Sequence, residues 1–330
     1  MPVVINSNAT ATASSQNLSR ANDALRKSLE RLSTGKRINS AADDAGGLSV
    51  AYKLNSKMNR TSSIIQNSQN ALSYLQMQDS SLASAGKIVD RMGELRTMAQ
   101  DITKNSGDIE NYSKEFVELQ GQLNQIAKEK FNGISLFSTG TGAPSGTLNY
   151  GSGGGTYIDT NGTSRTYNTF SRTLQTHDSG NTTDGSVSLN VINFQFMLSI
   201  HSTSTTATGA GAQGFNLGNI GDVNNKTTEF TSSGYINDIK QVSVGAFTDV
   251  IARIADMRAE NGAEQNRVMQ RLDLLQSNLT NIEAAHGRIM DADIALESTR
   301  FARHNILVQA SASMTAQANQ LSSVALSLIG

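Results

Sequence analysis

Apolar residues recur at three- and four-residue intervals along residues 1–137 of this 330-residue chain. The clearest stripes have members seven apart: Leu18, Leu25 and Leu32 with Leu29 between them, and further on Leu75, Leu82 and Val89. A strand would instead alternate apolar and polar side chains with a period of two. The spacing therefore predicts amphipathic helices that pack lengthwise against partner helices.

The strongest periodicity lies in residues 236–330. Its seam positions are Val268, Leu272, Leu275, Leu279, Ile282 and Ile289, with Leu296 completing the seven-residue run. Beyond residue 303 the stripe continues through Leu307, Met314, Leu321, Val324 and Leu328. A sustained seven-residue period predicts left-handed supercoiling against other helices. We therefore predict a mainly α fold, a long antiparallel coiled-coil rod formed by the paired N- and C-terminal arms.

Residues 138–235 differ from both flanks, because they are rich in glycine, threonine and serine and hold more than half of the 28 glycines. The segments "TYIDT", "SVSLNVINFQFML" and "TEFTSSGY" predict short strands between turns. The run "GSGGG" at residues 151–155 lacks the strand and helix that flank a phosphate-binding loop, so we interpret it as a flexible turn. The middle third is predicted to be a β-rich domain inserted at the far end of the rod.

Both ends of the chain lack charge: residues 1–19 and 305–330 contain no Asp, Glu, Lys or Arg. A helix of that composition is marginal alone in water, since most helical stability comes from tertiary contacts. One interpretation is an ordinary buried C-terminal helix, which leaves the matching N-terminus unexplained. We favour the alternative, in which both ends order only when a neighbouring copy packs against them. The stripes from Leu18 to Leu32 and from Leu307 to Leu328 are then assembly surfaces.

A charged joint separates the first two predicted helices, within the segment "SLERLSTGKRINSAADDAGGLSVA". Gly35 stands where a helix-ending glycine belongs, and Ser40 with Asp43 forms a Ser-x-x-Asp pattern that predicts the cap of the next helix. Arg37 would lie near the negative end of the first helix, and Asp43 and Asp44 near the positive end of the second, as helix dipoles prefer.

Two adjacent glycines, Gly46 and Gly47, follow within the second predicted helix. Each costs about 1 kcal/mol there relative to alanine. We therefore expect another chain or arm to approach them closely.

Composition excludes several classes of function. With no cysteine there is no disulfide, thiol chemistry or cysteine metal site, and a net charge of −1 gives no general case for binding nucleic acid or an anionic membrane. The N-terminus lacks a basic region followed by an apolar stretch, so we expect no cleaved signal peptide. No catalytic motif is found, and the four histidines share no metal-ligand spacing, so we expect no catalytic residue, cofactor or metal. A secreted enzyme with its site in residues 138–235 is the rival interpretation.

The joint segment resembles the N-terminal signature of bacterial flagellin. Other segments are similar to the same family: "KFNGISLF" at 130–137, "NGAEQNRV" at 261–268, "GRIMDADIALE" at 287–297 and "ILVQASASMTAQANQ" at 306–320. The resemblance covers both helical thirds and not the middle. It implies a subunit that is exported unfolded, without a cleaved signal, and polymerises outside the cell into the flagellar filament. A hook–filament junction protein, which has similar arms, is the nearest alternative.

The resemblance also assigns each region of the chain to a part of the filament. Residues 1–43 and 297–330 would be the arms of the inner filament core, 44–137 and 236–296 the rod helices, and 138–235 the variable, outward-facing insertion. Implied partners are other copies of the chain, an export chaperone, the filament cap and hook-junction proteins. A flagellin-sensing Toll-like receptor would engage the surface around residues 90–100, through Arg91, Leu95 and, on the following helix, Glu118.

Overall fold

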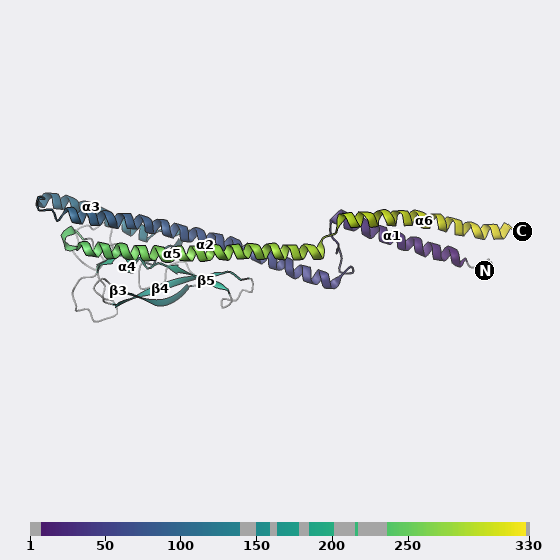
Figure 1. Cartoon of the computed structure of the whole chain (residues 1–330), viewed down its shortest axis with the longest axis horizontal. Coiled ribbons are helices and arrows are strands. Elements are labelled where there is room, and N and C mark those ends of the chain that lie inside the picture. Colours follow the sequence, from purple (N-terminus) through teal and green to yellow (C-terminus); the bar gives the residue numbers. More distant parts are fainter. Residues whose placement is uncertain are drawn as a thin grey trace. The chain divides into compact units, whose positions relative to one another are not determined.

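A computed structural model of the chain describes residues 8–138, 150–158, 164–177, 185–200, 215–216 and 236–327. The chain divides into two compact units, one made of residues 1–60 and 277–330 and the other of residues 61–276. The long helices in this part are α1 (Ala9–Thr34), α2 (Ala45–Met98), α3 (Ser106–Ala127), α5 (Val244–Met290) and α6 (Ile294–Ser327) (Figure 1). The predicted mainly helical fold is confirmed.

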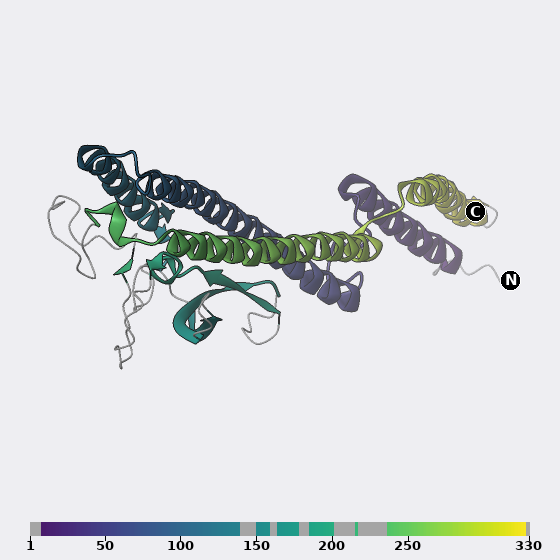
Figure 2. The ribbon, with the colours of Figure 1, turned by 60° about the vertical axis from the view of Figure 1, so that its left-hand side comes forward.

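In the unit formed by the two ends, α1 and α6 lie side by side and antiparallel (Figures 1 and 2). The side chain of Asn8 caps α1 by accepting from the Ala11 N–H, and its amide donates to the Ala318 carbonyl on α6 at 2.9 Å. At the opposite end of the pair, Nη1 of Arg31 on α1 lies 3.9 Å from Oε2 of Glu297 on α6. Low residue numbers on one helix thus meet high numbers on the other.

The second unit is built on α2 and α5, which also run antiparallel. Asp79 pairs with Nε of Arg258 at 2.9 Å, and further along α2 Nε of Arg96 donates to the Val242 carbonyl at 2.6 Å. Helix α3 packs beside them, where the rings of Phe116 and Phe247 meet edge to face at 6.0 Å. The most completely buried side chains of this core include Leu75, Leu82, Val89, Met92, Phe116, Leu123, Phe247, Val250 and Val268.

Burial decreases along the predicted C-terminal seam. Leu272 and Leu275 are buried, whereas Leu279, Ile282 and Ile289 are only half-buried. Helix α5 ends at Met290 and α6 begins at Ile294, so the seven-residue run does not lie on one helix. Leu296 is exposed, and its interpretation as a further seam position is wrong. The spacing of apolar residues stays regular across residues 291–293, so it could not predict the break between the two helices there.

The middle of the chain forms an antiparallel sheet of β3 (Tyr150–Ile158), β4 (Ser164–Gln175) and β5 (Ser186–Val191), in that order, on the side of α5 (Figure 2). The interpretation of "GSGGG" as a turn is wrong, because residues 151–155 pair with residues 167–171 of β4. The predicted strand over 186–198 also ends early, and α4 (Phe194–Met197) follows it, capped by Asn193. The segment "TEFTSSGY" lies outside the described residues.

Three smaller elements complete the described chain. A hairpin of β1 (Lys130–Phe131) and β2 (Ile134–Ser135) turns at Asn132 and Gly133, whose φ angles are 49° and 78°. Asn-Gly is the preferred pair for such a two-residue turn, because both residues must be left-handed. Strand β6 (Ser199–Ile200) pairs with β7 (Phe215–Asn216), and the 3₁₀ helix η1 (Ile239–Gln241) precedes α5.

Buried side chains of the helices form hydrogen bonds to the backbone at both ends of the middle segment. Where the chain leaves, the Leu136 carbonyl accepts from the Tyr74 hydroxyl at 3.2 Å and from the Gln78 amide at 3.0 Å. Where it returns, the amide of Gln120 donates to the Ile236 carbonyl and accepts from its N–H, each at 3.1 Å. Every one of these polar groups is buried yet partnered, as an apolar core requires.

Two adjacent leucines of α5 test this core, because Leu275 is 8% exposed and Leu274 is 48% exposed. We expect Leu275→Ala to lower the free energy of unfolding by about 2–5 kcal/mol, since it leaves a cavity in the core. Leu274→Ala should change it by no more than about 0.5 kcal/mol, as surface substitutions usually do. Denaturant unfolding followed by circular dichroism measures both. Equal effects of the two variants would contradict the seam.

Candidate assembly surfaces

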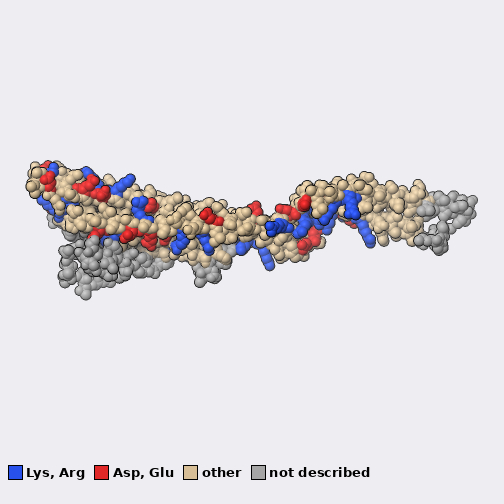
Figure 3. All heavy atoms as spheres, viewed as in Figure 1, with Lys and Arg blue, Asp and Glu red and all other residues tan. Residues whose placement is uncertain are grey.

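The α1–α6 pair exposes large apolar side chains, and several of them lie on the part of α6 that carries no charge. On α6, Ile306 and Met314 are each 66% exposed and Leu307 is 44% exposed, while Leu29 of α1 is 54% exposed. On the face shown in Figure 3, charged side chains gather toward one end of this unit, and the stretch toward the termini is almost free of them. Contiguous exposed apolar surface is a feature of association sites, so an assembly role for these residues stays a prediction.

The other predicted assembly residues differ in their exposure. Leu18, Leu25 and Leu32 of α1 are half-buried, so part of each is already covered within one chain. Leu321 and Val324 belong to α6, and Leu328 lies outside the described residues. That the two ends order only on assembly stays a prediction.

Glu297 is nearly fully buried in the first turn of α6, between two arginines. Its Oε2 lies 3.4 Å from Nη1 of Arg300 and 3.9 Å from Nη1 of Arg31 on α1. The partial positive charge at a helix N-terminus also favours a carboxylate there. A buried charge is costly without a partner, so this cluster favours one arrangement of the two terminal helices.

The joint between α1 and α2 is hydrogen-bonded to the break between α5 and α6. Gly35 ends α1 in the left-handed conformation, with φ 68°, and its carbonyl accepts from the Ala292 N–H at 2.9 Å. The N–H of Arg37 donates to the Met290 carbonyl at 2.6 Å, and its guanidinium donates to the Ile289 carbonyl at 2.9 and 3.2 Å. Arg37 follows the end of α1 by three residues, and its guanidinium bonds to the carbonyl end of α5, a contact that the sequence did not predict.

Asp43 holds the joint loop together from inside. Its Oδ2 accepts from the N–H groups of Asn39 and Ser40, both at 3.2 Å, and from the Ser40 hydroxyl at 3.3 Å. Its Oδ1 lies 2.6 Å from the Lys27 ammonium on α1. The hydrogen bond from Lys27, followed by those from the two N–H groups, lowers the pKa of Asp43 from 3.8 to about 2.

The cap of α2 is Asp44 rather than the predicted Ser40. Asp44 Oδ1 accepts from the Gly47 N–H at 2.9 Å, one residue before the helix begins. A Cβ on Gly47 would collide with this capping carboxylate and come within 2.9 Å of the Ile38 Cδ1, whereas a Cβ on Gly46 would meet nothing closer than Asp44 Oδ1 at 3.5 Å. The expected close approach is therefore made by the chain's own loop, and only at Gly47.

A small apolar cluster lies beneath the joint and was missed in the sequence. Ile38, Ala51 and Met290 are buried together, with Leu48 and Ile289 packed against them. Ile38 stands alone between the charged pair at 36–37 and polar residues, so no periodicity points to it. The cluster brings together the first turns of α2 and the last turn of α5.

The predicted receptor residues do not share one surface. Leu95 is 0% exposed, so its assignment as a receptor contact is wrong; the helical period that carries Met92 into the core also carries Leu95 there. Arg91 is accessible and pairs with Glu115 and Glu94 at 2.8 and 2.9 Å, which raises the pKa of its guanidinium. Glu118 is exposed on α3, but Glu115 is the acid that meets Arg91.

Neither metal ligands nor membrane helices are found in the described chain. Across its described residues, no three His, Cys, Asp or Glu side chains come close enough to hold a metal ion. The described helices include none that combines the length and the hydropathy needed to cross a membrane.

Comparison with known families matches both helical thirds. Residues 5–141 match the bacterial flagellin N-terminal helical region, and residues 244–329 match the bacterial flagellin C-terminal helical region. The chain is 26% identical over 388 aligned positions to polar flagellin F of Vibrio parahaemolyticus, with 100% of both chains covered. It is 26% identical over 330 positions to the flagellar filament 33 kDa core protein of Treponema phagedenis, covering 99% of this chain and 100% of that one.

Two solved structures are also similar. Bacillus cereus flagellin matches 67% of this chain and 94% of its own, with a TM-score of 0.42 and 22% identity. A putative flagellar hook-associated protein from Vibrio parahaemolyticus matches 76% of this chain and 100% of its own, with a TM-score of 0.52 and 15% identity. At that identity the second match shows a shared fold and nothing more.

The two glycines of α2 make a matched pair for testing the joint. Gly46→Ala should stabilise the protein by up to about 1 kcal/mol, because alanine favours a helix and its Cβ has room here. Gly47→Ala should destabilise it relative to Gly46→Ala by about 1–2 kcal/mol, because the new Cβ displaces the Asp44 cap. Thermal melts of the two variants give the order. Stabilisation by both would remove the steric role assigned to Gly47.

The lowered pKa of Asp43 makes the joint sensitive to acid. A carboxyl whose pKa is lower in the folded state stabilises the protein above its unfolded pKa, and that contribution is lost as pH falls through the folded pKa. The melting temperature of the wild type should therefore exceed that of Asp43→Asn at pH 5, and the difference should close toward pH 2. Asp23→Asn, which removes an exposed acid of α1, is the control. A pH-independent gap between wild type and Asp43→Asn would contradict the assignment.

Proposed function

The chain belongs to the bacterial flagellin family and is a structural subunit of the flagellar filament, and from this premise we propose that copies join mainly through the exposed apolar residues of α1 and α6. The family match covers residues 5–141, which include α1, and residues 244–329, which include α6. The family match implies that the polymer is a flagellar filament. The exposed apolar residues of the terminal pair support the placement of the contact surface on these helices.

The observation that carries the proposal is the contrast between exposure and charge on α6. Ile306 and Met314 stand largely in solvent, yet no charged residue occurs after Arg303. Burying such side chains gains about 25 cal/mol per Å² of apolar surface. When two copies meet through different patches, each added copy is rotated relative to the last. If that rotation does not close a ring, the copies form an open helical filament.

The proposal extends to the division of the chain. Residues 1–43 and 297–330 supply the inner core of the filament, residues 44–137 and 236–296 supply the rod helices, and residues 138–235 form the outward-facing insertion. The hydrogen bond between Gly35 and Ala292 joins the two breaks between helices, at 35–44 and 291–293, and supports a change from arm to rod close to them. The family membership also supports export without a cleaved signal peptide.

Further partners follow from the family resemblance and stay predictions. They are the export chaperone, the filament cap and the hook-junction proteins. For a flagellin-sensing Toll-like receptor, Arg91 and Glu118 remain accessible on α2 and α3, while Leu95 does not. The hook–filament junction alternative is not better supported, because the hook-associated match shows fold alone.

Met314→Asp tests the assembly face. The substituted side chain is exposed in the single chain, so we expect the circular dichroism spectrum and melting temperature of the monomer to stay within error of the wild type. A charge buried between copies should abolish seeded filament growth, because an unpaired buried charge is strongly unfavourable. Turbidity and electron microscopy after seeding measure growth.

Gln175→Asp provides the control, since Gln175 is exposed on β4 in the segment proposed to face outward. It should leave both the monomer and filament growth unchanged. Normal growth of Met314→Asp filaments would overturn the assignment of this face. Failure of Gln175→Asp to assemble would overturn the outward placement of the insertion.

A further inference from the structure

Strand β5 is the last strand of its sheet, and only one of its two edges meets β4. In an antiparallel pair, alternate residues direct their N–H and C=O groups toward the neighbour, and the residues between direct theirs away. Ser188 and Asn190 are two residues apart, so both direct their backbone groups to the same edge. Both bond to α5 instead of β4. The outer edge of β5 therefore faces a helix where a fourth strand would stand.

Two charged residues one turn apart on α5 occupy this edge. The carboxylate of Glu264 accepts from the Asn190 N–H, with its two oxygens at 2.9 and 3.0 Å from the nitrogen. The Arg267 guanidinium donates to the Ser188 carbonyl. The two side chains also face each other, with 4.0 Å between Nη2 of Arg267 and Oε1 of Glu264. A carboxylate and a guanidinium thus supply the acceptor and the donor that a neighbouring strand would supply.

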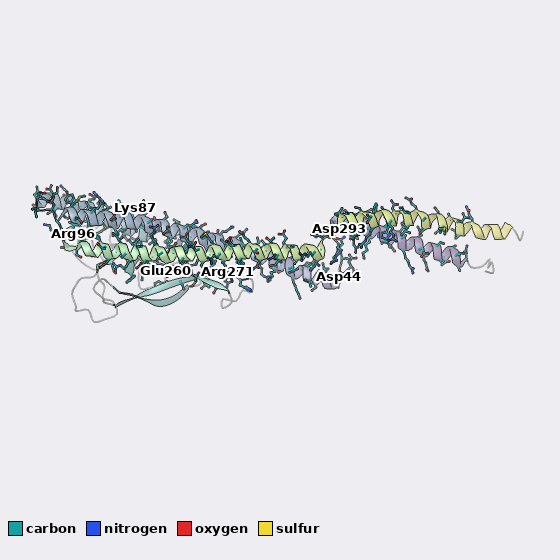
Figure 4. All side chains as sticks on the ribbon, in the orientation of Figure 1. Asp44, Lys87, Arg96, Glu260, Arg271 and Asp293 are labelled. Carbon is teal, nitrogen blue, oxygen red and sulfur yellow. The ribbon has the colours of Figure 1, made fainter. Side chains whose placement is uncertain are left out.

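The same face of α5 continues toward the end of β4. Residues three and four apart on a helix share a face, and Arg271 follows Arg267 by four positions on α5, in the stretch that Figure 4 labels beside the sheet. Nε of Arg271 donates to the Thr176 hydroxyl at 3.2 Å, just beyond the last residue of β4. This third contact fixes the direction in which the sheet lies along the helix.

We propose that Glu264 and Arg267 form a strand-edge clamp that binds the outer backbone edge of β5 and prevents that edge from pairing with the sheet of a second copy. An open strand edge is a template for pairing between chains, and proteins cover or charge such edges. In a polymer that holds many copies close together, uncovered edges on outward-facing insertions would meet one another. The clamp is independent of the terminal assembly face, so it can be tested on monomers.

Amide exchange at single residues tests the clamp directly. In Glu264→Ala, exchange at the Asn190 amide should accelerate about tenfold or more, since its hydrogen bond to a charged acceptor is lost. The Leu189 amide, which points toward β4, should keep its protection. Glu264→Gln retains an acceptor oxygen and should restore most of the protection at Asn190. Glu260→Ala removes an exposed acid one turn earlier and should change neither amide.

The pH dependence gives a readout that a purely structural role of residue 264 would not produce. Burial raises the pKa of Glu264 from 4.5 to about 7, against the opposing effects of the Asn190 N–H and Arg267. The other charged or titratable groups around it are Glu260 on α5 and Tyr74 on α2, with Arg172 of β4 over the Tyr74 ring. The hydrogen bond from the Asn190 N–H favours the ionised carboxylate, so this contact strengthens as Glu264 loses its proton. Protection at Asn190 should therefore rise between pH 6 and pH 8 in the wild type and stay constant in Glu264→Gln.

Association of monomers tests the second half of the proposal. The double variant Glu264→Ala/Arg267→Ala should form oligomers in light scattering at concentrations where the wild type and Glu260→Ala are monomeric. If Glu264→Ala loosens the whole sheet, Leu189 also loses protection, and recovery of both amides in Glu264→Gln still supports the clamp. The proposal is overturned if Asn190 exchange is unchanged in Glu264→Ala, if Glu264→Gln fails to restore it, or if the double variant stays monomeric.

Discussion

Antiparallel contact between α2 and α5 is the interaction on which the rod unit depends. Residues nearly two hundred positions apart meet along this contact, as the pair of Asp79 and Arg258 shows. Burial of Leu75, Leu82 and Val89 on one side and of Val268 and Leu275 on the other supplies its stability. Once these helices are paired, α3 has a groove to fill, and α5 has a second face on which a sheet can lie.

The two helix pairs of this protein differ in how completely they bury their apolar side chains. The α2–α5 pair, with α3, completes its apolar core within one chain. The α1–α6 pair holds itself together through half-buried leucines and the buried Glu297 cluster but leaves Ile306 and Met314 in solvent. A helix that buries only part of its apolar surface has an unmet requirement for a partner. The proposed assembly through α1 and α6 depends on this difference, because a subunit must leave apolar surface uncovered if its neighbours are to bind there.

The sequence predicted features that depend on repeated spacing and missed those that depend on single contacts. Heptad positions such as Val268 and Leu275 belong to long regular patterns, so their burial could be anticipated. The Asp44 cap could not be distinguished from Ser40 by pattern alone, because both lie within reach of a helix start and only the backbone geometry chooses. Residues 151–155, four of them glycine, look like a turn in the sequence, whereas strand pairing uses backbone groups that every residue has. The clamp at Glu264 has no local signature, because its partner lies 74 positions away.

The paired anchoring of Leu136 and Ile236 has a consequence for how the middle segment can change over time. The entropy of closing a loop grows only with the logarithm of its length, so each doubling costs about 0.6 kcal/mol. Gln78, Tyr74 and Gln120 hold the two ends in place through main-chain groups, so this anchoring does not depend on the side chains of the segment between them. Lengthening, shortening or exchange of the outer segment would then leave the polymer lattice intact. The chemistry of the segment between the two anchors can thus change while its attachment to the helices stays the same.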